Sequence, residues 1–189
     1  MTGDTRNIWS KFLAGNHRAF EQLYQLNVDK LYDYGIRLCQ DPNIVEDSLQ
    51  EMFTQLWIRR DVLPEVASVT GYLLVALRRR ILRVMSSNQR LQHPVEDLYG
   101  NFNVDFNPHI SDTISEDVIA QLKSAFSKLT DKQKEVVYLK FYNNLNYDEI
   151  AEVLDVTTKS VYKLMSRAIN SMRIQVDLTL LPLILSALF

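Results

Sequence analysis

Apolar residues recur at helical spacing through the first half of the chain. Asp41 and Pro42 are suited to begin a helix, because an acid can cap the first turn and proline needs no N–H donor there. The apolar face of this helix comprises Val45, Leu49, Met52, Phe53 and Leu56. A further helix is predicted from about Ser68, with an apolar face made of Val69, Tyr72, Leu73, Ala76, Leu77, Ile81 and Val84. No segment alternates apolar and polar residues long enough to indicate a sheet, so an all-α module is predicted.

A second set of helices follows from position 130. Thr130 with Gln133 is typical of a capping box and predicts a helix through about Tyr142. The next helix is predicted over 147–154, with Val156 filling the turn after it. The last helix is predicted to bury Val161, Leu164, Ala168 and Met172. Its outward rows are Lys159, Lys163 and Arg167 beside Tyr162, Ser166 and Asn170.

Charge is sorted along these last two helices. Residues 147–156 carry four acids and no cation, whereas residues 157–173 carry four cations and no acid. A helix that offers cations for phosphates and polar groups for base edges is typical of helix-turn-helix DNA binding, with the acidic helix kept off the DNA backbone. Amphipathic helix pairs also occur in plain bundles, which leaves that alternative open.

Charge also divides the chain into modules, although the net charge of its 189 residues is only -2. Residues 58–90 contain seven arginines against two acids, and residues 91–130 contain two lysines against six acids. Prolines, Asn and Asp in the latter stretch indicate a linker. We therefore predict modules at 1–87 and 113–176, an acidic linker at 88–112, and an apolar tail at 177–189.

Several classes of protein are disfavoured by the sequence. Cys39 is the one cysteine and no signal peptide is evident, which favours the cytoplasm. The apolar stretch 178–189 is shorter than the roughly 20 residues of a membrane helix, and we expect it to pack on the C-terminal helices. The three histidines are far apart, so no metal site is expected. The sequence has no glycine-rich phosphate-binding loop, and no other cofactor is expected. Glu46, Asp47 and Glu51 lie on one helix without a cleft partner, which disfavours an enzyme.

Three segments in this order resemble an extracytoplasmic-function (ECF) RNA polymerase sigma factor. They are AFEQLYQLNVDKLYDYGIRL, DPNIVEDSLQEMFTQLW and LTDKQKEVVYLKFYNNLNYDEIAEVLDVTTKSVYKLMSRA. The resemblance spans residues 16–173, and YLLVALRRRIL with the apolar tail is similar to ECF factors of Bacteroidetes. It implies two helical domains, sigma regions 2 and 4, and three partners: promoter DNA, core RNA polymerase through its β′ coiled coil and β flap, and a membrane-anchored anti-sigma factor.

The resemblance also implies which residues bind. The candidates for binding the polymerase β′ coiled coil are Asp47, Gln50, Glu51 and Gln55. The candidates for holding the melted −10 element are Arg59, Arg60, Tyr72, Arg78, Arg79, Arg80 and Arg83. The candidates for reading the −35 duplex are Thr158, Lys159, Tyr162, Lys163, Ser166 and Arg167. Asp47 and Glu51, and the arginines of the −10 set, have an alternative interpretation as ordinary solvated helix faces.

The sequence departs from the common ECF pattern at four of its positions. Tyr72 stands where tryptophan is frequent and Arg79 where asparagine is frequent. Asp155 replaces the usual turn glycine and Tyr162 a frequent lysine, so the DNA sequences recognised are not predictable. A dimeric helix-turn-helix regulator outside the polymerase and a helical adaptor remain alternative functions.

Overall fold

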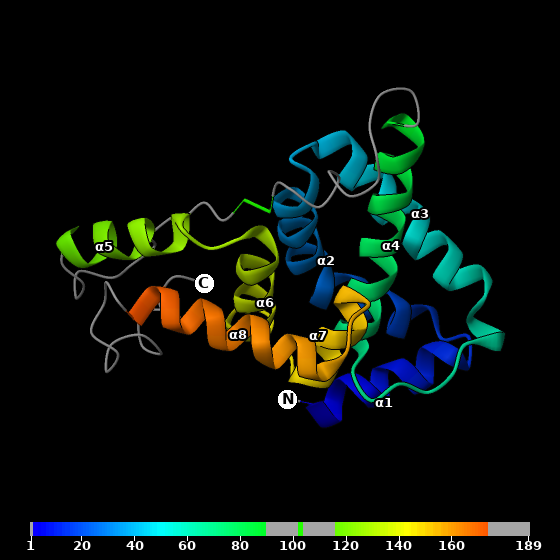
Figure 1. The fold of residues 1–189 in the computed structure, drawn as a ribbon. Coiled ribbons are helices and arrows are strands. Elements are labelled where there is room, and N and C mark those ends of the chain that lie inside the picture. The colour runs from blue at the N-terminus through cyan, green and yellow to red at the C-terminus, as the bar shows by residue number, and fades with distance from the viewer. Residues whose placement is uncertain (1, 90–101, 104–115, 174–189) are drawn as a thin grey trace. The chain divides into compact units, whose positions relative to one another are not determined.

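All regular elements are helical in the part of the chain that the computed structural model describes, residues 2–89, 102–103 and 116–173 (Figure 1). The chain divides into two compact units, residues 1–101 and residues 102–189. This confirms the all-α prediction. Most of the predicted linker and all of the predicted tail at 177–189 lie outside the described residues. No helix within those residues is long and apolar enough to cross a membrane.

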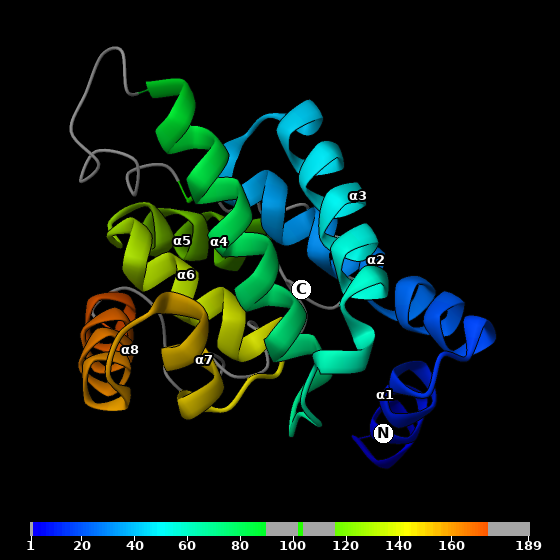
Figure 2. The ribbon, with the colours of Figure 1, turned by 90° about the vertical axis from the view of Figure 1, so that its right-hand side faces the viewer.

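The first unit is built around three long helices that pack against one another. Its elements are α1 (Thr2–Leu13), α2 (His17–Cys39), α3 (Pro42–Ile58), the 3-10 turn η1 (Arg60–Val62) and α4 (Val69–Gln89). As predicted, the Asp41 carboxylate caps α3 and accepts from the backbone N–H groups of Asn43 and Ile44 at 3.0 and 3.3 Å. α1 packs against α2 (Figure 2), and it also contacts α4 and η1.

A close helix approach in this unit depends on one glycine. A Cβ atom on Gly35 of α2 would lie 2.7 Å from Val45 Cγ1 of α3 and 3.3 Å from Ile81 Cδ1 of α4. Both neighbours are fully buried, so neither can easily move aside. Glycine therefore lets α2, α3 and α4 meet at this level of the core.

The second unit has the order of helices that the sequence predicts after position 130. Its elements are α5 (Glu116–Ser127), α6 (Asp131–Phe141), α7 (Tyr147–Leu154) and α8 (Thr158–Arg173). The Thr130–Gln133 capping box is present at the start of α6. α8 packs against the three other helices. At the end of α7, Asp155 adopts the left-handed conformation, with φ 54° and ψ 49°. Asp is among the few non-glycine residues that adopt it at modest cost.

Some predicted core positions are wrong. In α8 the buried residue is Met165, 3% exposed, rather than the half-buried Leu164. The α8 core face therefore runs through positions 161, 165, 168 and 172, which are separated by steps of four, three and four residues. Val156 is 37% exposed and does not fill the turn. In α4 the residues that are half-buried rather than buried are Tyr72, Ala76 and Val84.

Candidate functional site

A cavity of about 310 Å³ in the first unit brings together most of the candidates for holding the −10 element. It lies between α3, the segment that follows it, and α4. Its lining residues are Met52, Gln55, Leu56, Arg59, Leu63, Tyr72, Ala76, Arg79, Arg80 and Arg83. We call this cavity the arginine pocket. Five of the seven candidates line it: Arg59 directly follows α3, and Tyr72, Arg79, Arg80 and Arg83 lie on α4.

The arginine pocket is cationic and partly open to solvent. Arg79 and Arg83 are exposed, and within the described residues neither forms an ion pair. Arg80 is half-buried, and its Nη1 atom lies 3.9 Å from Glu51 Oε1 of α3. Because four arginines line one cavity together with apolar residues, the pocket suits an anionic ligand that also carries a flat apolar surface.

Two of the candidates for the −10 element do not line the pocket. Arg78 is only 5% exposed, so its position does not support the predicted contact with DNA phosphates. One residue step turns a helix by about 100°, so Arg78 points toward the side of α4 that buries Leu74 and Leu77. Arg60 lies over the Trp57 ring at 4.5 Å, and its Nη1 donates to the Trp57 carbonyl at 2.8 Å.

The predicted polymerase-binding row divides between two sides of α3. Gln55 lines the arginine pocket, whereas Gln50 lines a second cavity between α2 and α3. Glu51 accepts a hydrogen bond from Gln55 Nε2 at 3.1 Å and faces Arg80, so it connects this row to the arginine pocket. Asp47 is exposed and lines neither cavity.

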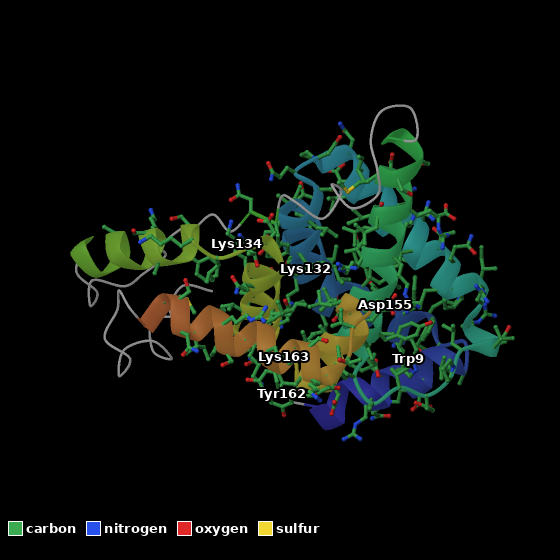
Figure 3. All side chains as sticks on the ribbon, viewed as in Figure 1. Trp9, Lys132, Lys134, Asp155, Tyr162 and Lys163 are labelled. Carbon is green, nitrogen blue, oxygen red and sulfur yellow. The ribbon has the colours of Figure 1, made fainter. Side chains whose placement is uncertain are left out.

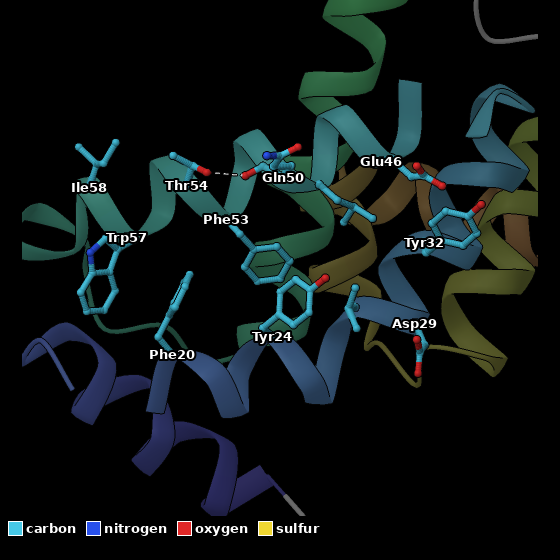
Figure 4. Close-up of a pocket in the computed structure, with 12 residues that line it drawn as sticks. Phe20, Tyr24, Asp29, Tyr32, Glu46, Gln50, Phe53, Thr54, Trp57 and Ile58 are labelled. Carbon is cyan, nitrogen blue, oxygen red and sulfur yellow. Dashed lines mark hydrogen bonds between the residues drawn. The ribbon is translucent and has the colours of Figure 1, made fainter. Parts of the chain in front are cut away.

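The second cavity, of about 720 Å³, has an aromatic end and an acidic end (Figure 4). Phe20 and Tyr24 of α2 face Phe53 and Trp57 of α3, with the Tyr24 and Phe53 ring centroids 4.9 Å apart. Asp29 and Glu46 lie at the other end with Tyr32. We call this cavity the aromatic groove. Its aromatic residues were not among the sequence candidates, because at helical spacing they are indistinguishable from core residues.

The candidates for reading the −35 duplex lie along α8 in the second unit. Those that are exposed are Lys159, Tyr162, Lys163, Ser166 and Arg167. The Tyr162 side chain is 55% exposed, and Tyr162 and Lys163 are labelled on α8 in Figure 3. Thr158 is half-buried, and its hydroxyl donates to Asp148 Oδ1 at 2.8 Å, so it is engaged within the protein. The cationic row is therefore accessible along one helix.

Tyr147 contacts Tyr162 of this surface, although the sequence analysis did not include it among the candidates. Its ring centroid lies 4.3 Å from that of Tyr162, and Lys140 Nζ lies 5.2 Å from the Tyr147 ring. The pair restricts where the exposed Tyr162 ring can point. The two tyrosines belong to different helices, so no pattern within a single helix reveals their contact.

The acids of α7 have local structural roles. Glu149 completes a capping box with Asn146, whose backbone N–H donates to Glu149 Oε2 at 2.7 Å. Asp148 accepts from Thr158 at the start of α8. Acids in the first turn also favour the positive end of the helix dipole. Helix capping therefore accounts for part of the charge sorting in the sequence.

Comparison with known proteins gives matches to sigma factors. Residues 119–172 match the family model described as sigma-70, region 4. The chain is 27% identical over 158 residues to ECF RNA polymerase sigma factor SigK of Mycolicibacterium vanbaalenii, covering 82% of this chain and 80% of that protein. It is 25% identical over 177 residues to the SigK protein of Mycobacterium ulcerans, covering 90% and 92%. These matches support the ECF RNA polymerase sigma factor family. The Bacteroidetes likeness stays a prediction, since these two relatives are mycobacterial.

Two solved complexes contain a chain that shares the fold of this protein. The structure of CnrH in complex with the cytosolic domain of CnrY matches with a TM-score of 0.58 and 19% identity, covering 89% of this chain and 94% of that chain. The sigma factor RpoE in complex with the anti-sigma factor NepR, from Bartonella quintana, matches with a TM-score of 0.58 and 23% identity, covering 84% and 98%. At these identities the matches bear on the fold alone.

Proposed function

We propose that this protein is an alternative sigma factor of the ECF type, which binds core RNA polymerase and directs promoter-specific transcription initiation. The observation that carries the proposal is the large share of the chain that the SigK relatives match. The SigK relatives match 82% and 90% of the chain, so the likeness extends beyond the helix-turn-helix into the first unit. A dimeric helix-turn-helix regulator would need only the second unit.

The arginine pocket is proposed to hold the melted −10 element. Single-stranded DNA presents phosphates for guanidinium groups and unstacked bases for aromatic rings. Arg79 and Arg83 are exposed for the phosphates, and Tyr72 offers a ring within the same cavity. A base flipped from the non-template strand would enter beside Tyr72. Binding the single strand but not the duplex here favours the open promoter without any chemical step by the sigma factor.

The exposed row of α8 is proposed to read the −35 duplex. Lys159, Lys163 and Arg167 suit phosphate contacts, while Tyr162 and Ser166 suit base edges in the major groove. Two separate surfaces are needed, because one element is double-stranded and the other is single-stranded during initiation. The family-model match to sigma-70 region 4 over α6–α8 supports this assignment.

Partners of the free protein follow from the same proposal. We infer that core polymerase contacts α3 at Asp47, Gln50, Glu51 and Gln55, and that the chain works in the cytoplasm. An anti-sigma factor is proposed as the regulator, as named for the RpoE complex of Bartonella quintana. Anchoring of that regulator in a membrane rests on the Bacteroidetes resemblance alone.

Transcription from purified components tests the proposal. Core polymerase with this protein is expected to initiate at discrete sites on genomic DNA fragments, whereas core polymerase alone initiates without such selection. The mapped start sites then supply the promoter. Discrete initiation would exclude three alternatives. These are a regulator that depends on a resident sigma factor, a helical adaptor, and an enzyme. Failure of the purified protein to associate with core polymerase would remove the proposal.

The −35 assignment predicts that Lys163→Ala with Arg167→Ala weakens holoenzyme binding to the mapped −35 duplex by about tenfold or more. Loss of two phosphate contacts should also reduce the slope of log affinity against log salt by roughly two. Filter binding over a salt series measures both quantities. The control is Lys123→Ala with Lys128→Ala, which removes the same charge from exposed positions elsewhere in the unit. Equal losses for the two pairs would indicate a nonspecific charge effect and contradict the assignment.

A further inference from the structure

Trp9 of α1 is buried beside the arginine pocket and bonded to the segment that forms one of its walls. Its side chain is 0% exposed, and its Nε1–H donates to the carbonyl oxygen of Pro64 at 3.1 Å. The two residues are 55 positions apart in sequence, so this bond fixes the segment between α3 and α4 to the N-terminal helix. Figure 3 labels Trp9 on α1.

The contacts of Trp9 reach two walls of the pocket. Pro64 directly follows Leu63, which lines the pocket from the segment after η1. The Trp9 ring also meets the Tyr72 ring edge-on, with centroids 5.4 Å apart, and Tyr72 lines the pocket from α4. The Trp9 indole therefore contacts one lining residue, Tyr72, directly. It also holds Pro64, which is the neighbour of a second lining residue, Leu63.

The segment from Leu63 to Ser68 belongs to no helix or strand. Its start is tied to η1 through the Leu63 N–H, which donates to the Arg60 carbonyl at 3.2 Å. Pro64 has no N–H to donate, so its carbonyl is the backbone group through which it can be held. A segment outside regular structure depends on such bonds for a fixed position.

We propose that Trp9 is a positioning residue for the arginine pocket, holding Pro64 and Tyr72 so that the pocket is formed before single-stranded DNA enters. This inference rests on the proposed function of the pocket. Preorganisation raises affinity because the ordering cost is met before binding. Trp9 itself is fully buried, so its proposed effect on DNA binding is indirect, through Pro64 and Tyr72.

The experiment removes the indole donor and keeps the packing. Trp9→Phe in the full-length protein keeps an aromatic ring without the N–H. A second variant carries benzothienylalanine at position 9, which retains the bicyclic shape with sulfur in place of the N–H, and it serves if phenylalanine unfolds the protein. The matched control is Phe12→Leu, because Phe12 is also 0% exposed on α1 and contacts Trp9 but has an all-carbon side chain.

Two readouts separate positioning from stability. The first is affinity of the holoenzyme for the non-template single strand of the mapped −10 region, and the second is hydrogen exchange of amides in residues 61–68. Loss of one net hydrogen bond predicts about a two- to tenfold weaker affinity for both Trp9 variants. Exchange of the segment should be faster in both. Phe12→Leu should lower the thermal midpoint with little change in either readout.

The outcomes distinguish this inference from the function on which it rests. Wild-type affinity in the benzothienylalanine protein, or an equal loss in Phe12→Leu, would overturn the positioning role of Trp9. If Arg79→Ala and Arg83→Ala also left single-strand affinity unchanged, the pocket itself would not be the −10 site. Weakening by the arginine variants but not by the Trp9 variants would leave the proposed function standing and remove only this inference.

Discussion

Replacing Arg79 and Arg83 together with alanine is expected to lower single-strand capture by about hundredfold. Hydrogen bonds to charged groups contribute roughly 1.5–3 kcal/mol each, which is about tenfold or more in affinity per arginine. Both side chains are exposed at the arginine pocket, and within the described residues neither has an ion-pair partner to leave behind. Their loss should therefore affect the DNA and leave the folded protein intact.

The measurement is promoter opening by the holoenzyme, followed by the reactivity of unpaired thymines, together with affinity for the −35 duplex. Opening should fail while −35 binding is retained. A matched control removes two exposed cations from α2 of the same unit, Arg18→Ala with Lys30→Ala. Normal opening by the Arg79 and Arg83 variant, or an equal failure by the control, would contradict the pocket assignment.

Helix positions were predictable because local chemistry determines them. Asp41 with Pro42, and Thr130 with Gln133, are contained within single turns, so the sequence displays the whole motif and the structure confirms both caps. α7 has the predicted bounds for the same reason. Helix α5 was missed because its first residues adjoin a stretch rich in acids and turn-forming residues.

Most residues of the arginine pocket could be predicted from the sequence, but the candidates that do not line it could not be recognised. Arginine spacing on α4 could not separate the exposed Arg79 from the buried Arg78, since core packing decides which side of a helix is covered. The role of α1 was invisible in the sequence, because the bond from Trp9 to Pro64 joins residues 55 positions apart. Such long-range contacts depend on how the helices meet, as at Gly35, and not on any local pattern.

The aromatic groove shows a second limit of prediction from sequence. Phe20, Tyr24, Phe53 and Trp57 follow the spacing of core residues, yet they line a cavity of about 720 Å³. Gln50 lies on its rim from the predicted polymerase-binding row, and the Thr54 hydroxyl donates to the Gln50 carbonyl at 2.7 Å. Periodicity identifies the buried side of each helix but not whether two such sides close completely against each other.

Glu51 complicates any test of the polymerase-binding row. A lysine at position 51 would bring a cation toward Arg80, whose Nη1 lies 3.9 Å from the present Glu51 carboxylate. It would also remove the acceptor for Gln55 Nε2. A defect in transcription caused by Glu51→Lys could therefore arise in the arginine pocket as readily as at the polymerase. Asp47 lies one turn earlier on α3, is exposed and lines neither cavity, which makes it the cleaner position.

Asp47→Lys is accordingly expected to weaken binding to core RNA polymerase by about tenfold or more, with the far-ultraviolet circular dichroism spectrum unchanged. Lysine is a good helix former, so α3 should persist, whereas reversing a charge that meets a complementary partner introduces repulsion across the interface. Competition with the wild-type protein for purified core polymerase measures the change.

Glu152→Lys makes the same charge change at an exposed position of α7 in the other unit and should compete normally. Single-strand affinity of preformed holoenzyme should be unaffected by Asp47→Lys, which separates this surface from the arginine pocket. Wild-type competition by Asp47→Lys would show that the exposed face of α3 around this residue is solvated in the holoenzyme and would remove Asp47 from the polymerase-binding row.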